Sequence, residues 1–296
     1  MNIKRIGAFL AVFCMVGITV FSAPAQKKLK ITATFHPLYI MLENITENVP
    51  GVEISMLAPA NTGCLHDYEL TTRDMKTITG SDILVANGAG MESFLEKALS
   101  MKKGAVILAA DGFQLTDDNP HVWVSPAGAV YEVQRIAAGL EKLDSAHAAM
   151  YKKNADAYIS RLQTLSAGMH KALDGFAGSR IITFHEAFPY FASEFHLQIA
   201  SVVEREPGTI PSAKELAELI AQIKKVQKAG GGISLFAEPQ YASSAADVIA
   251  RETGLTVYEL DPGVTGSIDK DSYINAMKQN AAVLQKALAG AAGSGK

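Results

Sequence analysis

The stretch Ser145–Leu173, SAHAAMYKKNADAYISRLQTLSAGMHKAL, decides the fold of this chain. It contains no proline, and its apolar side chains recur at helical spacing: Met150, Ala157, Ile159, Leu162, Leu165 and Met169. The helix that this pattern predicts is long for a globular protein. Because alternating strand and helix patterns lie on both sides of it, we expect a rigid connector between two lobes.

Strand patterns flank this connector, and helical patterns separate them. They lie at Lys30–Phe35, Val52–Leu57, Asp82–Ala86 and Ala105–Ala109 before it, and at Arg180–Phe184, Gln198–Val203, Gly232–Ala237 and Thr256–Leu260 after it. Such alternation is typical of parallel sheets covered by helices. We therefore predict an α/β fold with two lobes, each a four-stranded, mostly parallel sheet covered by helices, linked by one long rigid helix. The predicted limits are 26–144 for the N-terminal lobe, 145–175 for the connecting helix and 176–290 for the C-terminal lobe.

The first 25 residues have the pattern of a signal peptide. Lys4 and Arg5 precede an apolar run from Ile6 to Val20 that is too short to span a membrane comfortably. Small residues follow, and cleavage is expected near Ala25. The sequence thus predicts an exported, periplasmic protein.

Composition excludes several classes of partner. The chain has 296 residues and a net charge of −3, and loss of two basic residues with the signal peptide would make it −5. Nothing in this charge predicts binding to nucleic acid or to an anionic membrane surface. Removal of the signal peptide would leave Cys64 as the only cysteine, so an internal disulfide is excluded and the core must hold the fold.

Chemically capable side chains gather where the predicted strands end. The carboxyl ends of parallel strands are where α/β proteins bind ligands. Six such residues follow predicted strands: His36, His66, His121, His185, Glu238 and Asp261. Imidazoles with a carboxylate suit a divalent transition metal such as zinc. No closely spaced pair such as HxxxH or CxxC occurs, so the ligands must converge from both lobes, as in a binding cleft.

Several motifs occur in an order that carries a family resemblance. They are HDYEL (66–70), Asn87-Gly88, Met91-Glu92, PHVWVSP (120–126), TFHEAF (183–188), PGTIPSAKEL (207–216), FAEPQ (236–240) and LDP (260–262). Together they resemble the metal-binding solute-binding proteins of bacterial ABC importers for zinc and manganese, from about Lys28 to Leu288. The resemblance implies two α/β lobes bridged by a long helix, with the metal between them.

The same resemblance implies a ligand set. His66, His121 and His185 match the three histidine positions, and Asp261 matches the fourth position, which water fills in some members. Members selective for manganese resemble this chain but tend to carry a carboxylate at the third position, so His185 favours zinc. The resemblance also suggests that His36 lines the cleft and that Glu238 accepts a hydrogen bond from a ligand imidazole.

Two features depart from the family pattern. The segment Gln114–Asn119 lacks the histidines of the metal-scavenging loop that many zinc-type members carry before the PHVW motif. Cys64 lies two residues before His66. We interpret Cys64 as a buried small residue because the family needs no cysteine there; a thiolate ligand is the alternative.

The sequence therefore predicts a monomeric carrier that captures Zn²⁺ and delivers it to the membrane subunit of an ABC permease. One alternative keeps this role with Mn²⁺ or Fe²⁺ as cargo. A second is an exported zinc-dependent hydrolase, with Glu238 or Glu186 as general base. A third, an adhesin, has no motif or patch to support it.

Overall fold

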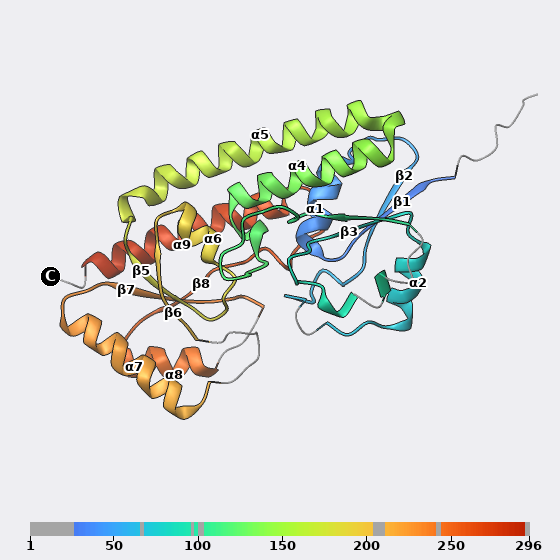
Figure 1. Ribbon diagram of the computed structural model, residues 1–296. Coiled ribbons are helices and arrows are strands. Elements are labelled where there is room, and N and C mark those ends of the chain that lie inside the picture. Colours follow the sequence, from blue (N-terminus) through green and yellow to red (C-terminus); the bar gives the residue numbers. More distant parts are fainter. Residues whose placement is uncertain are drawn as a thin grey trace, which may run out of the picture.

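The chain folds into two α/β lobes joined by long helices. A computed structural model describes residues 27–65, 68–95, 98–99, 104–203, 211–240 and 244–293. Figure 1 shows a sheet in each lobe and the long helix α5 (Ala148–Leu173) running beside both. The predicted fold class and the long helix between the lobes are confirmed.

The N-terminal lobe holds a four-stranded sheet in the order β2-β1-β3-β4, with all neighbouring strands parallel. Its strands are β1 (Leu29–Ala33), β2 (Val52–Met56), β3 (Ile83–Ala86) and β4 (Ala105–Leu108). The helices between them are α1 (His36–Ile45) and α2 (Thr72–Gly80), and a short turn of 3-10 helix, η1, covers Ser93–Leu95. Every side chain of β3 is buried, as expected for a central strand covered on both faces.

The C-terminal lobe repeats this arrangement with the order β6-β5-β7-β8, again parallel throughout. Its strands are β5 (Arg180–Thr183), β6 (Gln198–Val202), β7 (Ile233–Ala237) and β8 (Val257–Glu259). The helices are α6 (Pro189–Glu194), α7 (Ala213–Lys228), α8 (Ser244–Thr253) and α9 (Ser272–Gly293). The strand bounds differ from the predicted ones by at most two residues at any end, and several ends match.

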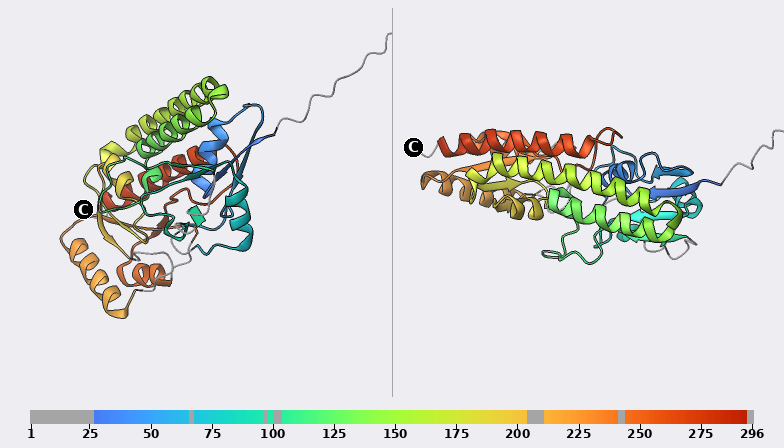
Figure 2. Two further views of the ribbon diagram at one scale, coloured as in Figure 1. Left: turned by 45° about the vertical axis from the view of Figure 1, so that its right-hand side comes forward. Right: turned by 90° about the horizontal axis from the view of Figure 1, so that it is seen from above.

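Three long helices lie side by side along the molecule. Helix α4 (Pro126–Leu143) packs against α5, and α5 packs against α9, which Figure 2 shows from above. The predicted buried face of α5 was partly wrong, because Ala157 is exposed and Ile159 is only half-buried. The buried side chains are instead Tyr151, Ala155, Tyr158, Leu162, Leu165, Met169 and Leu173. Leu162, Leu165 and Met169 were part of the predicted face. Tyr151 and Tyr158 were not, because the prediction followed the spacing of aliphatic side chains.

Contacts between distant segments hold the two lobes together. Trp123 is fully buried, packs edge-on against Phe35 and donates from Nε1 to the carbonyl of Pro262 in the C-terminal lobe at 2.9 Å. Tyr273 on α9 donates to the carbonyl of Trp123 at 2.8 Å. Trp123 therefore packs between the lobes and does not present a face for stacking.

Parts of the chain lie outside the described residues. Between β3 and β4 the structure shows η1, whereas residues 96–97 and 100–103 lie outside the described part of the chain. The predicted signal peptide, residues 1–25, also lies outside it. Across the described residues, no helix is both long and apolar enough to cross a membrane.

Helix α4 carries a buried carboxyl group on its inner face, that of Glu132. Glu132 is fully buried, and neither of its carboxyl oxygens has a hydrogen-bond partner among the described residues. Burial raises the pKa of Glu132 well above its ordinary value, and the nearby Glu92 carboxyl raises it further. The protonated form is therefore the one that the folded protein favours.

This pKa predicts that Glu132→Gln stabilises the protein at neutral pH. The unfolded chain releases the Glu132 proton near its ordinary carboxyl range, whereas the folded protein retains it. Stability therefore falls as pH rises from that range up to the folded-state pKa, by about 1.4 kcal/mol for each pH unit between them. The free energy of unfolding of Glu132→Gln and of the wild type is measured in denaturant from pH 4 to 8. The variant should have the larger value at high pH, and the two values should converge near pH 4.

Candidate metal centre

A rigid segment positions His121. It immediately precedes a short 3-10 helix, η2 (Val122–Val124), and Ser125 then caps α4 by accepting a hydrogen bond from Gly128 N–H at 2.9 Å. Gly128 has no room for a side chain, because a Cβ atom there would lie 1.9 Å from the Val122 carbonyl oxygen. This close approach fixes η2 against the start of α4, and with it the position of His121.

Asn119 orients the imidazole of His121. Its Oδ1 lies 3.0 Å from both the backbone nitrogen and the ring Nδ1 of His121. Because an amide oxygen only accepts, His121 Nδ1 carries the proton and Nε2 carries the lone pair. Asn119 also donates from Nδ2 to the carbonyl of Glu186 at 2.8 Å, so it links His121 to the residue that follows His185.

His185 lies in the C-terminal lobe, where only Phe184 separates it from the end of β5. It is 2% exposed, and its Nδ1 is 3.0 Å from Oε1 of Glu238, which directly follows β7 and is also buried. The Glu238 carboxylate accepts a hydrogen bond from His185 Nδ1–H. Nε2 is therefore the ring nitrogen that can bind a metal. The predicted hydrogen bond between Glu238 and a site imidazole is confirmed.

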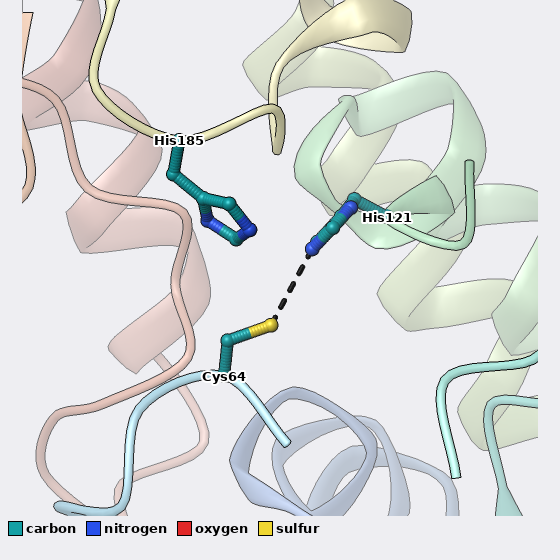
Figure 3. A group of neighbouring side chains, drawn as sticks. All are labelled: Cys64, His121 and His185. Carbon is teal, nitrogen blue, oxygen red and sulfur yellow. Dashed lines mark hydrogen bonds between the residues drawn. The ribbon is translucent and has the colours of Figure 1, made fainter. Parts of the chain in front are cut away.

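The two imidazoles meet a cysteine between the lobes. The rings of His121 and His185 are perpendicular, with centroids 4.7 Å apart. Cys64 Sγ is 3.4 Å from His121 Nε2, and one ligand atom from each of the three residues lies within 4.8 Å of the others. Figure 3 shows the three side chains pointing toward a common centre from three separate segments. Two nitrogens and a sulfur at this spacing are a donor set for a transition metal.

A buried polar network holds the segment behind His121. Glu92 accepts hydrogen bonds from the backbone N–H of Asn87 and Gly88 and from the Thr34 hydroxyl. Asn87 in turn donates from Nδ2 to the carbonyl of Pro120 at 2.9 Å. Burial raises the pKa of Glu92, while these hydrogen bonds oppose the change. The motif residues Asn87 and Glu92 therefore support the backbone that carries His121.

The structure does not bring all four predicted ligands together. His121 and His185 lie in the group just described, whereas His66 lies outside the described residues. Asp261 is not part of the group. Its Oδ1 accepts hydrogen bonds from Gln240 Nε2 at 2.9 Å and from Gly263 N–H at 2.8 Å. Asp261 as a ligand stays a prediction.

Other sequence candidates have structural contacts of their own. His36 is buried, but its ring nitrogens face the carbonyl oxygens of Gly263 and Ser267, so it joins the lobes and does not enter the metal group. Sequence reasoning assigned no role to Asn119, although the residue stands two positions before His121. An Asn-Pro pair just before a candidate ligand is the signal that could have revealed it.

The match to a known family covers nearly all of the chain. Residues 31–287 match the family described as zinc-uptake complex component A, periplasmic. The chain belongs to this family. The predicted resemblance to metal-binding solute-binding proteins of ABC importers is thereby confirmed.

Members and structural neighbours of this zinc-uptake family show what the chain is similar to. It is 29% identical to the high-affinity zinc uptake system protein ZnuA of Bacillus subtilis, over 88% of each chain. The solute-binding protein FpvC of Pseudomonas aeruginosa, solved with Mn²⁺, has a TM-score of 0.80 at 31% identity and covers 89% of this chain and 99% of its own. Zn(II)-bound AdcA of Streptococcus pneumoniae has a TM-score of 0.75 at 27% identity; the match covers 88% of this chain but only 57% of AdcA.

The orienting role of Asn119 predicts a selective effect on metal binding. Asn119→Ala removes the acceptor for His121 Nδ1–H and the link to Glu186. Zinc affinity should fall by about 10- to 100-fold, which is typical for loss of a residue that orients a metal ligand. Competition titration against a chelator of known affinity measures the change.

Asn154→Ala is the matched control for this substitution. Asn154 also donates from Nδ2 to backbone carbonyls, those of Ile45 and Glu47, but it lies on α5 away from the metal group. Zinc affinity should stay at the wild-type value in this variant. Equal losses in both variants would mean that Asn119 acts only through general stability.

Proposed function

We propose that this protein captures Zn²⁺ between its two lobes outside the cytoplasm and delivers it to the membrane subunit of an ABC permease. The observation that carries the proposal is the convergence of His121 and His185 from separate lobes. Each has its Nδ1 bonded to a polar side chain, so each can offer Nε2 to a metal. The relatives named as zinc-uptake and zinc-binding proteins support the choice of cargo.

In this proposal, His66, His121 and His185 are the protein's imidazole ligands. Asp261, which the sequence predicts as the fourth ligand, is tested separately below. Neutral imidazoles can bind a divalent ion. They carry no charge, so the empty site holds no excess of negative charge from these ligands. The ion would lose much of its hydration on entry, so its ligands must replace that shell within a buried site. Zinc suits this change because it accepts four-coordinate nitrogen and sulfur shells.

The site suits a carrier better than a hydrolase. A catalytic zinc needs an open position that a substrate can reach. Here His121 is 0% and His185 2% exposed. Glu238, one of the two carboxylates that a hydrolase could use as a base, is instead bonded to His185 at 3.0 Å. These contacts favour binding of a bare ion over chemistry on a larger molecule.

The choice of zinc over manganese or iron rests on the ligand chemistry. Imidazole suits zinc, whereas manganese prefers carboxylate, carbonyl and water oxygen. His185 supplies nitrogen at the third predicted position, as expected of a zinc carrier. FpvC has been solved with Ni²⁺ as well as Mn²⁺, so the metal in a related structure does not by itself name the cargo of this chain.

Export and partnership complete the proposal. The predicted signal peptide, cleaved near Ala25, places the carrier in the periplasm, and we expect it to act there as a monomer. The permease subunit is the protein partner, since a solute-binding protein needs a membrane component to move its cargo. Uptake of labelled zinc by cells that lack this chain should recover with the wild type and fail with His121→Ala.

Direct metal binding tests the ligand assignment. The exported wild type should hold one tightly bound zinc per chain, and His185→Ala should weaken it strongly because one nitrogen ligand is lost. Metal analysis and competition titration measure both. His170→Ala serves as the matched control, because His170 lies on α5 and pairs with Asp174 away from the site.

Asp261→Ala separates two versions of the site. A loss comparable to that of His185→Ala would make Asp261 a ligand; an unchanged affinity would assign the fourth position elsewhere. The zinc proposal fails if the wild type retains manganese or iron against equimolar zinc. It fails entirely if the protein binds no transition metal.

A further inference from the structure

Cys64 lies beside the two described imidazoles of the metal group. It follows Gly63, whose φ of +84° turns the loop after β2 inward, and its side chain is only 8% exposed. Its sulfur belongs to the same group as the ligand atoms of His121 and His185. A cysteine that merely filled space could direct its sulfur toward any of the neighbouring apolar side chains. Here the sulfur faces a ring nitrogen at 3.4 Å.

The spacing fits a tetrahedral zinc shell. Zinc–sulfur bonds of about 2.3 Å and zinc–nitrogen bonds of about 2.0 Å place tetrahedral sulfur and nitrogen ligands about 3.5 Å apart. The observed separation of Cys64 Sγ from His121 Nε2 is 3.4 Å. His121 Nδ1–H donates a hydrogen bond to Asn119 Oδ1. The lone pair of the ring is therefore on Nε2. Sulfur and nitrogen can therefore bind one ion with little movement of either side chain.

Asp261 is poorly placed for the same position. Its Oδ1 already accepts two hydrogen bonds, and its backbone N–H and carbonyl are both bonded to the side chain of Asn280. These contacts fix Asp261 outside the group that contains Cys64. Cys64, by contrast, already lies inside the group.

We infer that the Cys64 thiolate is the fourth ligand of the transported metal and selects for ions that bind sulfur. The inference rests on the proposed function and identifies what completes its site. When Zn²⁺ binds, the S–H proton passes to solvent and a zinc–sulfur bond forms, beside bonds to His121 and His185. The thiolate and the Glu238 carboxylate together balance the two positive charges of the ion, which lowers the cost of burying it.

A sulfur ligand changes which ions the site prefers. Thiolate favours zinc and other ions that bind sulfur strongly, such as Cd²⁺, whereas manganese prefers oxygen ligands. Cys64 should therefore widen the gap between zinc and manganese affinities. A serine at this position keeps the size of the side chain but replaces sulfur by a weakly coordinating hydroxyl, so it should narrow that gap.

The test uses the exported protein, with its mass measured to show that Cys14 has been removed with the signal peptide. Loading the wild type with Cd²⁺ or Co²⁺ should produce the ultraviolet charge-transfer absorption of a metal–thiolate bond, one per chain. Cys64→Ser should lack this absorption. Its zinc affinity should fall by about 10-fold or more, the scale of losses around metal sites, while its manganese affinity changes much less.

His170→Ala is the control, because His170 lies on α5 and pairs with Asp174 away from the metal group. It should retain both the charge-transfer absorption and the zinc affinity. Because the absorption is measured on the wild type, the test does not depend on how well any variant folds. Melting curves of the metal-free variants show whether an affinity change reflects the site or the fold.

Distinct results would overturn the inference. A wild type that binds one zinc but shows no thiolate absorption with Cd²⁺ or Co²⁺ would exclude Cys64 as a ligand and leave the proposed function intact. Equal losses of zinc and manganese affinity in Cys64→Ser would reduce Cys64 to a packing role. A wild type that binds no metal would remove the proposed function and this inference together.

Discussion

The site depends above all on the hydrogen bonds of Asn119. One amide group fixes the proton of His121 on Nδ1 and at the same time holds the carbonyl of Glu186, the neighbour of His185. A backbone contact reinforces it, because the Tyr190 hydroxyl on α6 donates to the Asn119 carbonyl at 2.6 Å. Imidazoles from different lobes therefore share one support, and their separation is set by contacts that do not involve the metal.

Such preorganisation needs lobes that keep their relative position. Three long helices lie together along the molecule, and Trp123 and His36 join the N-terminal lobe to the segment after β8. Near the start of α9, Asn44 donates to the carbonyl of Lys270, and Arg161 forms an ion pair with Asp271. A binding protein that is braced in this way loses little conformational entropy when it takes up an ion.

The charge of the site explains how a buried dication can be tolerated. Imidazoles contribute donor atoms but no charge, so the compensating charge must come from acids near the ion. Glu238 supplies one negative charge through its bond to His185, and a thiolate at Cys64 would supply the other. Buried charges are stable when they are paired and hydrogen-bonded, and this arrangement meets that condition. Two further acids are buried: Glu132 on α4, and Glu92 in the network behind His121. The fold favours the protonated form of Glu132.

The sequence by itself determined the architecture and the identity of most candidate residues. Alternating strands, the proline-free stretch 145–173 and ordered motifs are local signals, and local signals predict elements and the ends of strands. It could not show that Cys64 lies beside His121, since 57 residues separate them and only the tertiary structure shows their contact. The role of Asn119 was hidden for the same reason: its partner Glu186 is 67 residues away. Spacing along the chain identifies which side chains follow a strand, whereas distances between side chains from different strands depend on how the two sheets pack.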